Sequence, residues 1–251
     1  MIDLADDPTA AALLAVVPCH PVPVSGTSPA LDALRAARAG HGLAVGHDGV
    51  MLILRRPWLA VDVPVTMPIA VDLPYGSIGE PGAVLRCGLI PGDYFGDILE
   101  HFRAALPNEE AAFILWNEET GAFALHFPVI DEATPSRLVY RTPVLDHGWH
   151  VVCDIHSHGS GAAFFSATDD ADDAHVTKIS LVIGRLGHPE GPLMASRLCA
   201  GGLFLPLPRS PFSGDIQCRP IPILDTIFPA PSTIARSGYC SSVVEATAPR
   251  C

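Results

Sequence analysis

The chain has 251 residues, 49% of them hydrophobic, and its 15 Lys and Arg against 27 Asp and Glu give a formal net charge of −12. This length and composition suit one large domain or a core with a smaller companion, and they exclude a chain that is disordered throughout. The acidic balance argues against binding a phosphate backbone as the main task, so we do not expect a nucleic-acid partner.

The sequence also argues against a membrane partner, because Pro, Gly and charged residues interrupt every apolar run before it reaches the length of a bilayer. Residues 1–7 carry negative charge where a secretory signal carries positive charge. Seven scattered cysteines without a Cys-x-x-Cys pair predict reduced, mostly buried thiols, although Cys240 and Cys251 could pair in an oxidising compartment. We therefore expect a cytoplasmic protein.

Residues 1–90 are predicted to form an N-terminal accessory region of α+β structure. A helix is expected over residues 29–39, with Ser28 as its N-cap and Gly40 at its end.

A hairpin is predicted next in this region. The apolar runs 43–45 and 50–54 flank His47-Asp48-Gly49, and an Asp-Gly pair favours a tight β-connection. Residues 61–81 are rich in Pro and Val, which indicates short edge strands or an extended linker.

Residues 91–206 are predicted to form an α/β core, followed by a Pro-rich C-terminal appendage over residues 207–251. Apolar residues recur at helical spacing over residues 94–106, and Pro107 ends that helix. The expected order after it is a buried strand over 111–116, strands over 122–129, 137–144 and 150–158, a helix over 169–176, and strands over 179–184, 195–199 and 203–207.

One segment of this core carries metal-binding chemistry. His156 and His158 are two residues apart at the end of a predicted strand, so their imidazoles project to the same face. Ser166 follows eight residues after His158, and the glycine-containing loop between them can fold back to deliver Asp169 as a third ligand. Three protein ligands with a fourth position for water are typical of catalytic zinc.

The Ser166-x-x-Asp169 pattern also fits a helix capping box, in which the hydroxyl and the carboxylate satisfy free backbone donors. The His-x-His pair upstream at the right distance favours the metal-site interpretation. The nearby Asp170, Asp172 and Asp173 are expected to favour the helix N-terminus and not to bind a second metal.

The order of helix, Pro107-Asn108-Glu109, strand, His156-Ser157-His158 and Ser166-x-x-Asp169 resembles the JAMM (MPN+) metallopeptidase family over residues 91–206. The resemblance implies an MPN-like (cytidine-deaminase-like) mixed sheet flanked by helices. It also implies a role for each matching residue: zinc ligation by His156, His158 and Asp169, proton abstraction from the zinc-bound water by Glu109, and stabilisation of the tetrahedral intermediate by Ser166. Zinc lowers the pKa of its water to about 7, so a nearby carboxylate can take that proton.

The sequence departs from the family pattern in three places. Gly159 stands where the family usually has proline. Ala112 and Trp116 replace the glycines expected after the glutamate, so Glu110 is an alternative general base. Asp154 occupies a position that is usually aromatic, and its place on the histidine face allows it to support a ligand or to compete as one.

The resemblance implies zinc-dependent hydrolysis of an amide or isopeptide bond, because family members often remove ubiquitin or ubiquitin-like modifiers. The layout of the whole chain resembles the protein A family of bacterial PRTRC cassettes. Those cassettes contain a ThiF-like activating protein, which implies a ubiquitin-like modifier or peptide as substrate and the activating protein as a partner. Two alternatives are a catalytically silent MPN scaffold that binds a protein partner, and a DNA-associated protein like RadC, whose motif is also followed by Ser-Gly, as in Ser160-Gly161.

Overall fold

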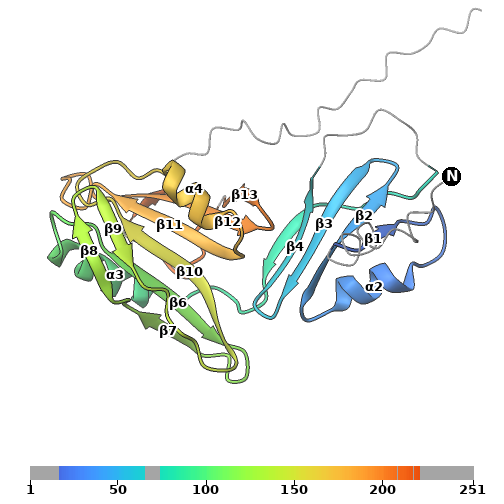
Figure 1. Cartoon of the computed structure of the whole chain (residues 1–251), viewed down its shortest axis with the longest axis horizontal. Coiled ribbons are helices and arrows are strands. Elements are labelled where there is room, and N and C mark those ends of the chain that lie inside the picture. Colours follow the sequence, from blue (N-terminus) through green and yellow to red (C-terminus); the bar gives the residue numbers. More distant parts are fainter. Residues whose placement is uncertain (1–16, 66–73, 208, 217, 221–251) are drawn as a thin grey trace, which may run out of the picture. The chain divides into compact units, whose positions relative to one another are not determined.

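The computed structural model describes residues 17–65, 74–207, 209–216 and 218–220. These residues form a mixed α/β structure with helices and three β-sheets (Figure 1). The α/β class expected from the sequence is confirmed at this level. Among the described residues, no helix is long and apolar enough to span a bilayer.

The N-terminal region contains a five-stranded sheet in the order β1-β2-β3-β4-β5, in which β1 is parallel to β2 and the other pairs are antiparallel. Its elements are β1 (Cys19–Pro21), α2 (Pro29–Ala36), β2 (Gly40–Gly46), β3 (Gly49–Arg56), β4 (Leu59–Pro64) and β5 (Gly82–Leu85). The predicted hairpin is confirmed, since β2 and β3 pair continuously up to Gly46 and Gly49. Asp48 in its turn accepts hydrogen bonds from Ser77 Oγ at 2.6 Å and from the Ile78 amide at 2.9 Å.

Two expectations for this region need correction. The helix ends at Ala36 because Ala37 is already extended, with φ −61° and ψ 150°, and Ser28 makes no capping hydrogen bond with its side chain. Strand β4 lies between β3 and β5 and is therefore not an edge strand. The rest of the predicted linker includes residues 66–73, which lie outside the described residues.

The core contains a seven-stranded sheet with the order β13-β12-β11-β10-β6-β7, to which β14 adds by pairing with β12. A separate two-stranded hairpin, β8-β9, and the helices α3 and α4 complete it. The elements are α3 (Asp93–Ala104), β6 (Ala111–Asn117), β7 (Phe123–His126), β8 (Ile130–Thr134), β9 (Arg137–Tyr140), β10 (Trp149–Ser157), α4 (Ala167–Asp173), β11 (Lys178–Gly184), β12 (Leu193–Ala200), β13 (Leu203–Pro206) and β14 (Arg219–Pro220).

Strand β10 is central to this sheet, because it runs antiparallel to β6 and parallel to β11. Every residue of β6 is buried, and so is every residue of β11 after Lys178. Their sequences are correspondingly continuous apolar runs, as expected for strands that are covered on both faces. The strand that leads into the histidines is thus fixed on both sides by buried neighbours.

Helix α3 agrees with its prediction, since its buried residues Phe95, Ile98, Leu99 and Phe102 follow the helical repeat. Helix α4 begins two residues earlier than predicted, and the strands predicted over 122–129 and 137–144 are shorter than expected. Strand β8 was missed, because its central residues are charged and exposed.

Part of the predicted C-terminal appendage packs tightly on the core. Phe212 is only 3% exposed and its ring meets Phe95 edge-on, with the ring centroids 5.1 Å apart. Cys218 is buried as well, and it is a free thiol like Cys153 and Cys199. The cysteines at 240 and 251 lie outside the described residues.

We expect Phe212→Ala to lower the free energy of unfolding by about 3 kcal/mol, because it leaves a cavity against Phe95. Urea denaturation of the full chain measures this. Val24→Ala is the control, since Val24 is 75% exposed and its truncation should change stability by less than about 0.5 kcal/mol. A value for Phe212→Ala as small as that of the control would show that this segment does not contribute to the core.

Candidate metal centre

The two histidines lie at the end of β10, where the backbone ladder is still intact. His156 pairs with Ala111 of β6 and Val182 of β11. The amide of His158 continues the ladder by donating to the carbonyl of Ile183 at 2.9 Å. Because the strand is extended here, both imidazoles reach the same side, and their Nε2 atoms are 3.3 Å apart.

Asp169, in the first turn of α4, completes a group of three. Its Oδ1 atom is 3.3 Å from Nε2 of His156, and the candidate ligand atoms of His156, His158 and Asp169 all lie within 4.8 Å of one another. Tetrahedral zinc binds nitrogen and oxygen at about 2.0–2.2 Å, which separates neighbouring ligand atoms by about 3.3–3.6 Å. The spacing and the chemistry of these side chains therefore fit a zinc ion.

The protonation of the histidines also suits a metal. Nδ1 of His158 lies 3.0 Å from the carbonyl oxygen of Ala162, so it carries the proton and leaves the lone pair of Nε2 free. The side chain of His156 is 11% exposed, and burial lowers its pKa below the ordinary value although Asp169 opposes this effect. His156 is thus neutral at neutral pH, which is the form that binds metals.

Ser166 and Asp169 form the capping box that the sequence allowed as an alternative. Ser166 Oγ accepts from the Asp169 amide at 3.2 Å, and Asp169 Oδ2 accepts from the Ser166 amide at 2.6 Å and from its hydroxyl at 2.7 Å. This leaves Oδ1 facing His156. The two interpretations are compatible, because each uses a different oxygen of one carboxylate.

The loop between the histidines and α4 explains the glycine that departs from the family pattern. Gly159 has a φ of +52°, which proline cannot adopt, and a Cβ there would lie 3.1 Å from the carbonyl oxygen of Pro107. The loop is fixed to the end of β11 by the amide of Arg185, which donates to Gly161 O at 2.7 Å. At Gly184 a Cβ would lie 2.5 Å from that same oxygen, so the close approach requires glycine.

The two candidate bases lie in different surroundings. Burial raises the pKa of Glu109, and the charges of His158 and Asp169 lower and raise it respectively, so this carboxylate is within electrostatic range of both candidate ligands. The carboxylate of Glu110 is engaged elsewhere: Oε1 accepts from the Ala111 amide at 2.9 Å and Oε2 is 3.6 Å from His101 Nε2. Glu109 has no such hydrogen bond from a neighbouring amide among the contacts described, and it stays the predicted base.

Asp154 does not compete as a ligand. It is buried, it accepts a hydrogen bond from Tyr140 Oη at 3.1 Å, and it pairs with Lys178. Lys178 also pairs with Asp173 at 2.9 Å, and Asp173 pairs with Arg197 at 2.7 Å. Sequence reasoning missed this network, although a lone basic residue in the apolar strand β12 was a signal for it.

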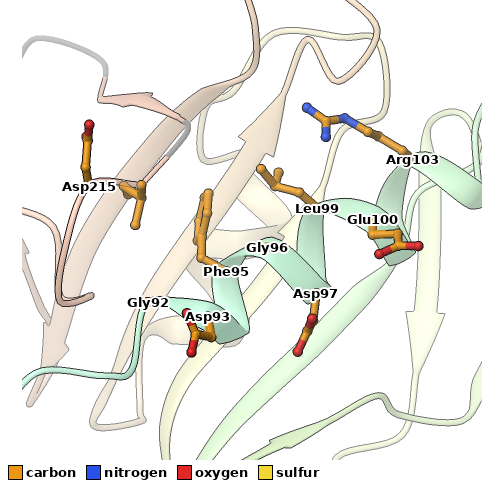
Figure 2. A pocket seen from close by; sticks show the side chains of 10 residues that line it. Gly92, Asp93, Phe95, Gly96, Asp97, Leu99, Glu100, Arg103 and Asp215 are labelled. Atoms are coloured by element: carbon orange, nitrogen blue, oxygen red, sulfur yellow. The ribbon is translucent and has the colours of Figure 1, made fainter.

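A separate cavity of about 680 Å³ lies along α3 (Figure 2). Its lining includes acidic side chains and Arg103 as well as Phe95 and Leu99, which are buried; the acidic residues are Asp93, Asp97, Glu100 and Asp215. Its described lining residues include no histidine or cysteine. The His156, His158 and Asp169 group is thus the stronger candidate for a functional site.

Two family models match parts of the chain. Residues 91–198 match the family described as prokaryotic homologs of the JAB domain. Over these residues the chain is similar to that family. Residues 7–86 match a second family, described as a domain of unknown function (DUF2016). The JAB family includes isopeptidases as well as inactive members.

Among solved structures, the solution structure of protein DSY2949 from Desulfitobacterium hafniense is similar to part of the chain. The identity is 20%, the match covers 43% of this chain and 81% of that chain, and the TM-score is 0.28. A TM-score this low carries no argument about fold or function. The search of curated proteins found no match.

We expect the full chain to bind one zinc ion and to gain thermal stability from it, by about 2.7 kcal/mol at a free concentration 100 times the Kd. His156→Ala and Asp169→Ala should weaken binding by more than about 100-fold, because losing a ligand costs more than losing a group that supports one. Competition with a chromophoric chelator measures the Kd. Asp172→Ala, an exposed neighbour on α4, is the control, and an equal loss in all three variants would contradict this site.

The buried ion pairs of Asp173 with Lys178 and Arg197 should make the free energy of unfolding fall at low pH. Burial alone would raise the pKa of Asp173, but Lys178 and Arg197 outweigh it and hold this pKa below its ordinary value of 3.8. The stabilisation is fully present above the ordinary value and is lost as the pH falls through the lower, folded-state value. We expect urea denaturation at several pH values to show a steeper loss below about pH 4 for the wild type than for Asp173→Asn. Identical slopes would mean that Asp173 is not paired in this way.

Proposed function

We propose that this chain is a zinc-dependent hydrolase that cleaves an amide or isopeptide bond, with the MPN-like arrangement expected of the JAMM family. The observation that carries the proposal is the close grouping of His156, His158 and Asp169, on two separate elements, at spacings that suit zinc. Three protein ligands leave a fourth position open, which is typical of catalytic and not of structural zinc.

The chain's own residues supply the remaining chemistry. Zinc held by these ligands would polarise the scissile carbonyl and acidify the attacking water. Glu109 would accept the proton of that water and return it to the leaving amine. Its raised pKa supports this role, because a general base works best when its pKa approaches the operating pH.

Ser166 has two roles in this proposal. Its hydroxyl donates to Asp169 Oδ2 at 2.7 Å and so orients the carboxylate of the third ligand. When substrate is bound, the same hydroxyl would turn to donate to the oxyanion of the tetrahedral intermediate. The capping box retains its backbone hydrogen bond to Asp169 Oδ2 during that exchange.

A cavity of about 900 Å³ supports a peptide substrate. It is lined by Asp154 and Lys178 of the seven-stranded sheet, by Tyr140 of the β8-β9 hairpin and by Thr168 of α4. Asp154 and Thr168 precede His156 and Asp169 by two residues and by one, so an extended chain in this cavity would pass next to the candidate ligands. We propose that the substrate is the C-terminal segment of a ubiquitin-like modifier, and that a ThiF-like activating protein is a partner, as the resemblance to the PRTRC protein A family implies.

The test is cleavage of a C-terminally conjugated ubiquitin-like modifier by zinc-loaded protein. Glu109→Gln should reduce the rate by about 10²–10⁴-fold, since that is the usual contribution of a general base. Glu110→Gln is the matched control, because its carboxylate binds the Ala111 amide and faces His101. Equal rates for Glu109→Gln and the wild type, or a selective loss in Glu110→Gln, would refute the assigned base.

A catalytically silent scaffold is the second candidate, because the JAB family includes inactive members. Metal content separates the two: a scaffold has no need of stoichiometric zinc, whereas the hydrolase should retain it through gentle purification. The DNA-associated alternative conflicts with the net charge of −12. Salt-sensitive binding to duplex DNA would restore it.

A further inference from the structure

Arg197 on β12 contacts three residues of the short segment 165–173 and one residue of β13. Its guanidinium donates to Asp173 Oδ2 from Nε at 3.1 Å and from Nη2 at 2.7 Å, and it pairs with Asp170 through Nη1. Its Cζ atom also lies 3.8 Å from the ring centroid of Phe165 and 4.0 Å from that of Phe204. The side chain is 7% exposed.

Three of these four partners surround the third candidate ligand in sequence. Phe165 precedes Asp169 by four residues, Asp170 follows it directly, and Asp173 follows it by four. Residues four apart in a helix lie on the same side, so the contact with Asp173 is one turn beyond the ligand. Arg197 therefore holds the chain on both sides of Asp169.

The sheet register places this clamp beside the histidines. Arg197 lies opposite Ser180, and Ser180 lies opposite Asp154 of β10. This cross-strand row lies two residues before the row that contains His156, so the side chains of Asp154 and His156 project to the same face of the sheet. Arg197 thus fixes α4 to the part of the sheet that carries the first two candidate ligands.

Helix α4 needs such a clamp. It has only seven residues, fewer than an isolated helix requires for stability in water. Four of the seven are aspartates, and its last turn has no basic residue, so the charges at its C-terminal end oppose the helix dipole. Its capping box fixes only the first turn, and Arg197, together with Lys178 at Asp173, supplies the countercharge that the rest of the helix lacks.

We propose that Arg197 is a positioning residue for the metal site: it clamps α4 to the sheet and thereby sets Oδ1 of Asp169 at ligand distance from His156. This inference rests on the proposed zinc site. Only arginine can fill the role, because its planar fork reaches two carboxylates while its face stacks on aromatic rings. Lysine would keep the charge and lose both the fork and the stacking.

The test measures zinc affinity by chelator competition and the visible spectrum of the cobalt-substituted protein. Arg197→Lys should weaken zinc binding by about 10–100-fold, as is usual when a group that supports a ligand is lost. Its cobalt spectrum should move toward that of Asp169→Ala. Arg219→Lys is the control, because Arg219 is 55% exposed and pairs with Glu190 away from α4.

A double-mutant cycle separates positioning from general stability. If Arg197 acts through Asp169, Arg197→Lys should have no further effect on zinc affinity in the Asp169→Ala background. An equal loss in both backgrounds would overturn the proposal. Asp170→Asn provides a second variant should Arg197→Lys fold poorly: its side chain is 50% exposed, and it should weaken zinc binding by a smaller factor in the same direction.

The outcomes distinguish this inference from the proposed function. If wild-type protein binds zinc and Arg197→Lys weakens it, but no conjugate is cleaved, then the hydrolase proposal fails and the positioning role stands. If conjugate is cleaved and Arg197→Lys binds zinc like the wild type, the positioning role fails alone. Absence of zinc and cobalt binding by the wild type would overturn both.

Discussion

The candidate site depends on the carboxylate of Asp169, because its two oxygens make contacts with different partners. Oδ2 closes the capping box with Ser166, while Oδ1 faces Nε2 of His156. An N-terminal cap is worth about 1 kcal/mol to a helix, so the start of α4 and the orientation of the third ligand are stabilised by the same contacts. A side chain with one polar oxygen could not serve both purposes. The helix and the metal site are therefore specified together.

The sheet provides the fixed reference for this arrangement. Strand β10 is held by β6 and β11 on its two sides. His156 and Asp154, two residues apart on this strand, bring the first ligand and the buried ion-pair network to the same face of the sheet. Buried charges are costly unless they are paired, and removing one partner is more damaging than replacing the whole set. Tyr140, Asp154, Lys178 and Asp173 satisfy one another around the clamp of Arg197. We interpret these buried charges, which cost free energy to desolvate, as the means by which the sheet holds α4 in one position.

The sequence predicted the features that arise from local spacing. The period of α3, the apolar strand before His156 and the His-x-His pair follow from residues that are close together in the chain. Local spacing did not distinguish Glu109 from Glu110 as the general base, because neighbouring side chains in an extended segment point to opposite faces. The partners of Lys178 and Arg197 depend on which strands become neighbours, and β8 carries charged residues where a buried strand would be apolar. The ion pairs of Lys178 and Arg197 include partners far from them in the sequence, and a local pattern does not predict such contacts.

The composition of the candidate site favours function over structure as its explanation. A capping box accounts for Ser166 and Asp169, but it does not require two imidazoles with Nε2 atoms 3.3 Å apart beside them. It requires Glu109 even less, since burial raises the pKa of that carboxylate, and His158 and Asp169 then lower and raise it respectively. Ionisable groups whose pKa is shifted by burial and by charged neighbours are typical of functional sites, because a well-packed apolar side chain would be more stable there. A cation bound between these residues would favour the ionised forms of Asp169 and Glu109 and the neutral forms of the histidines, whose nitrogen lone pairs would bind it.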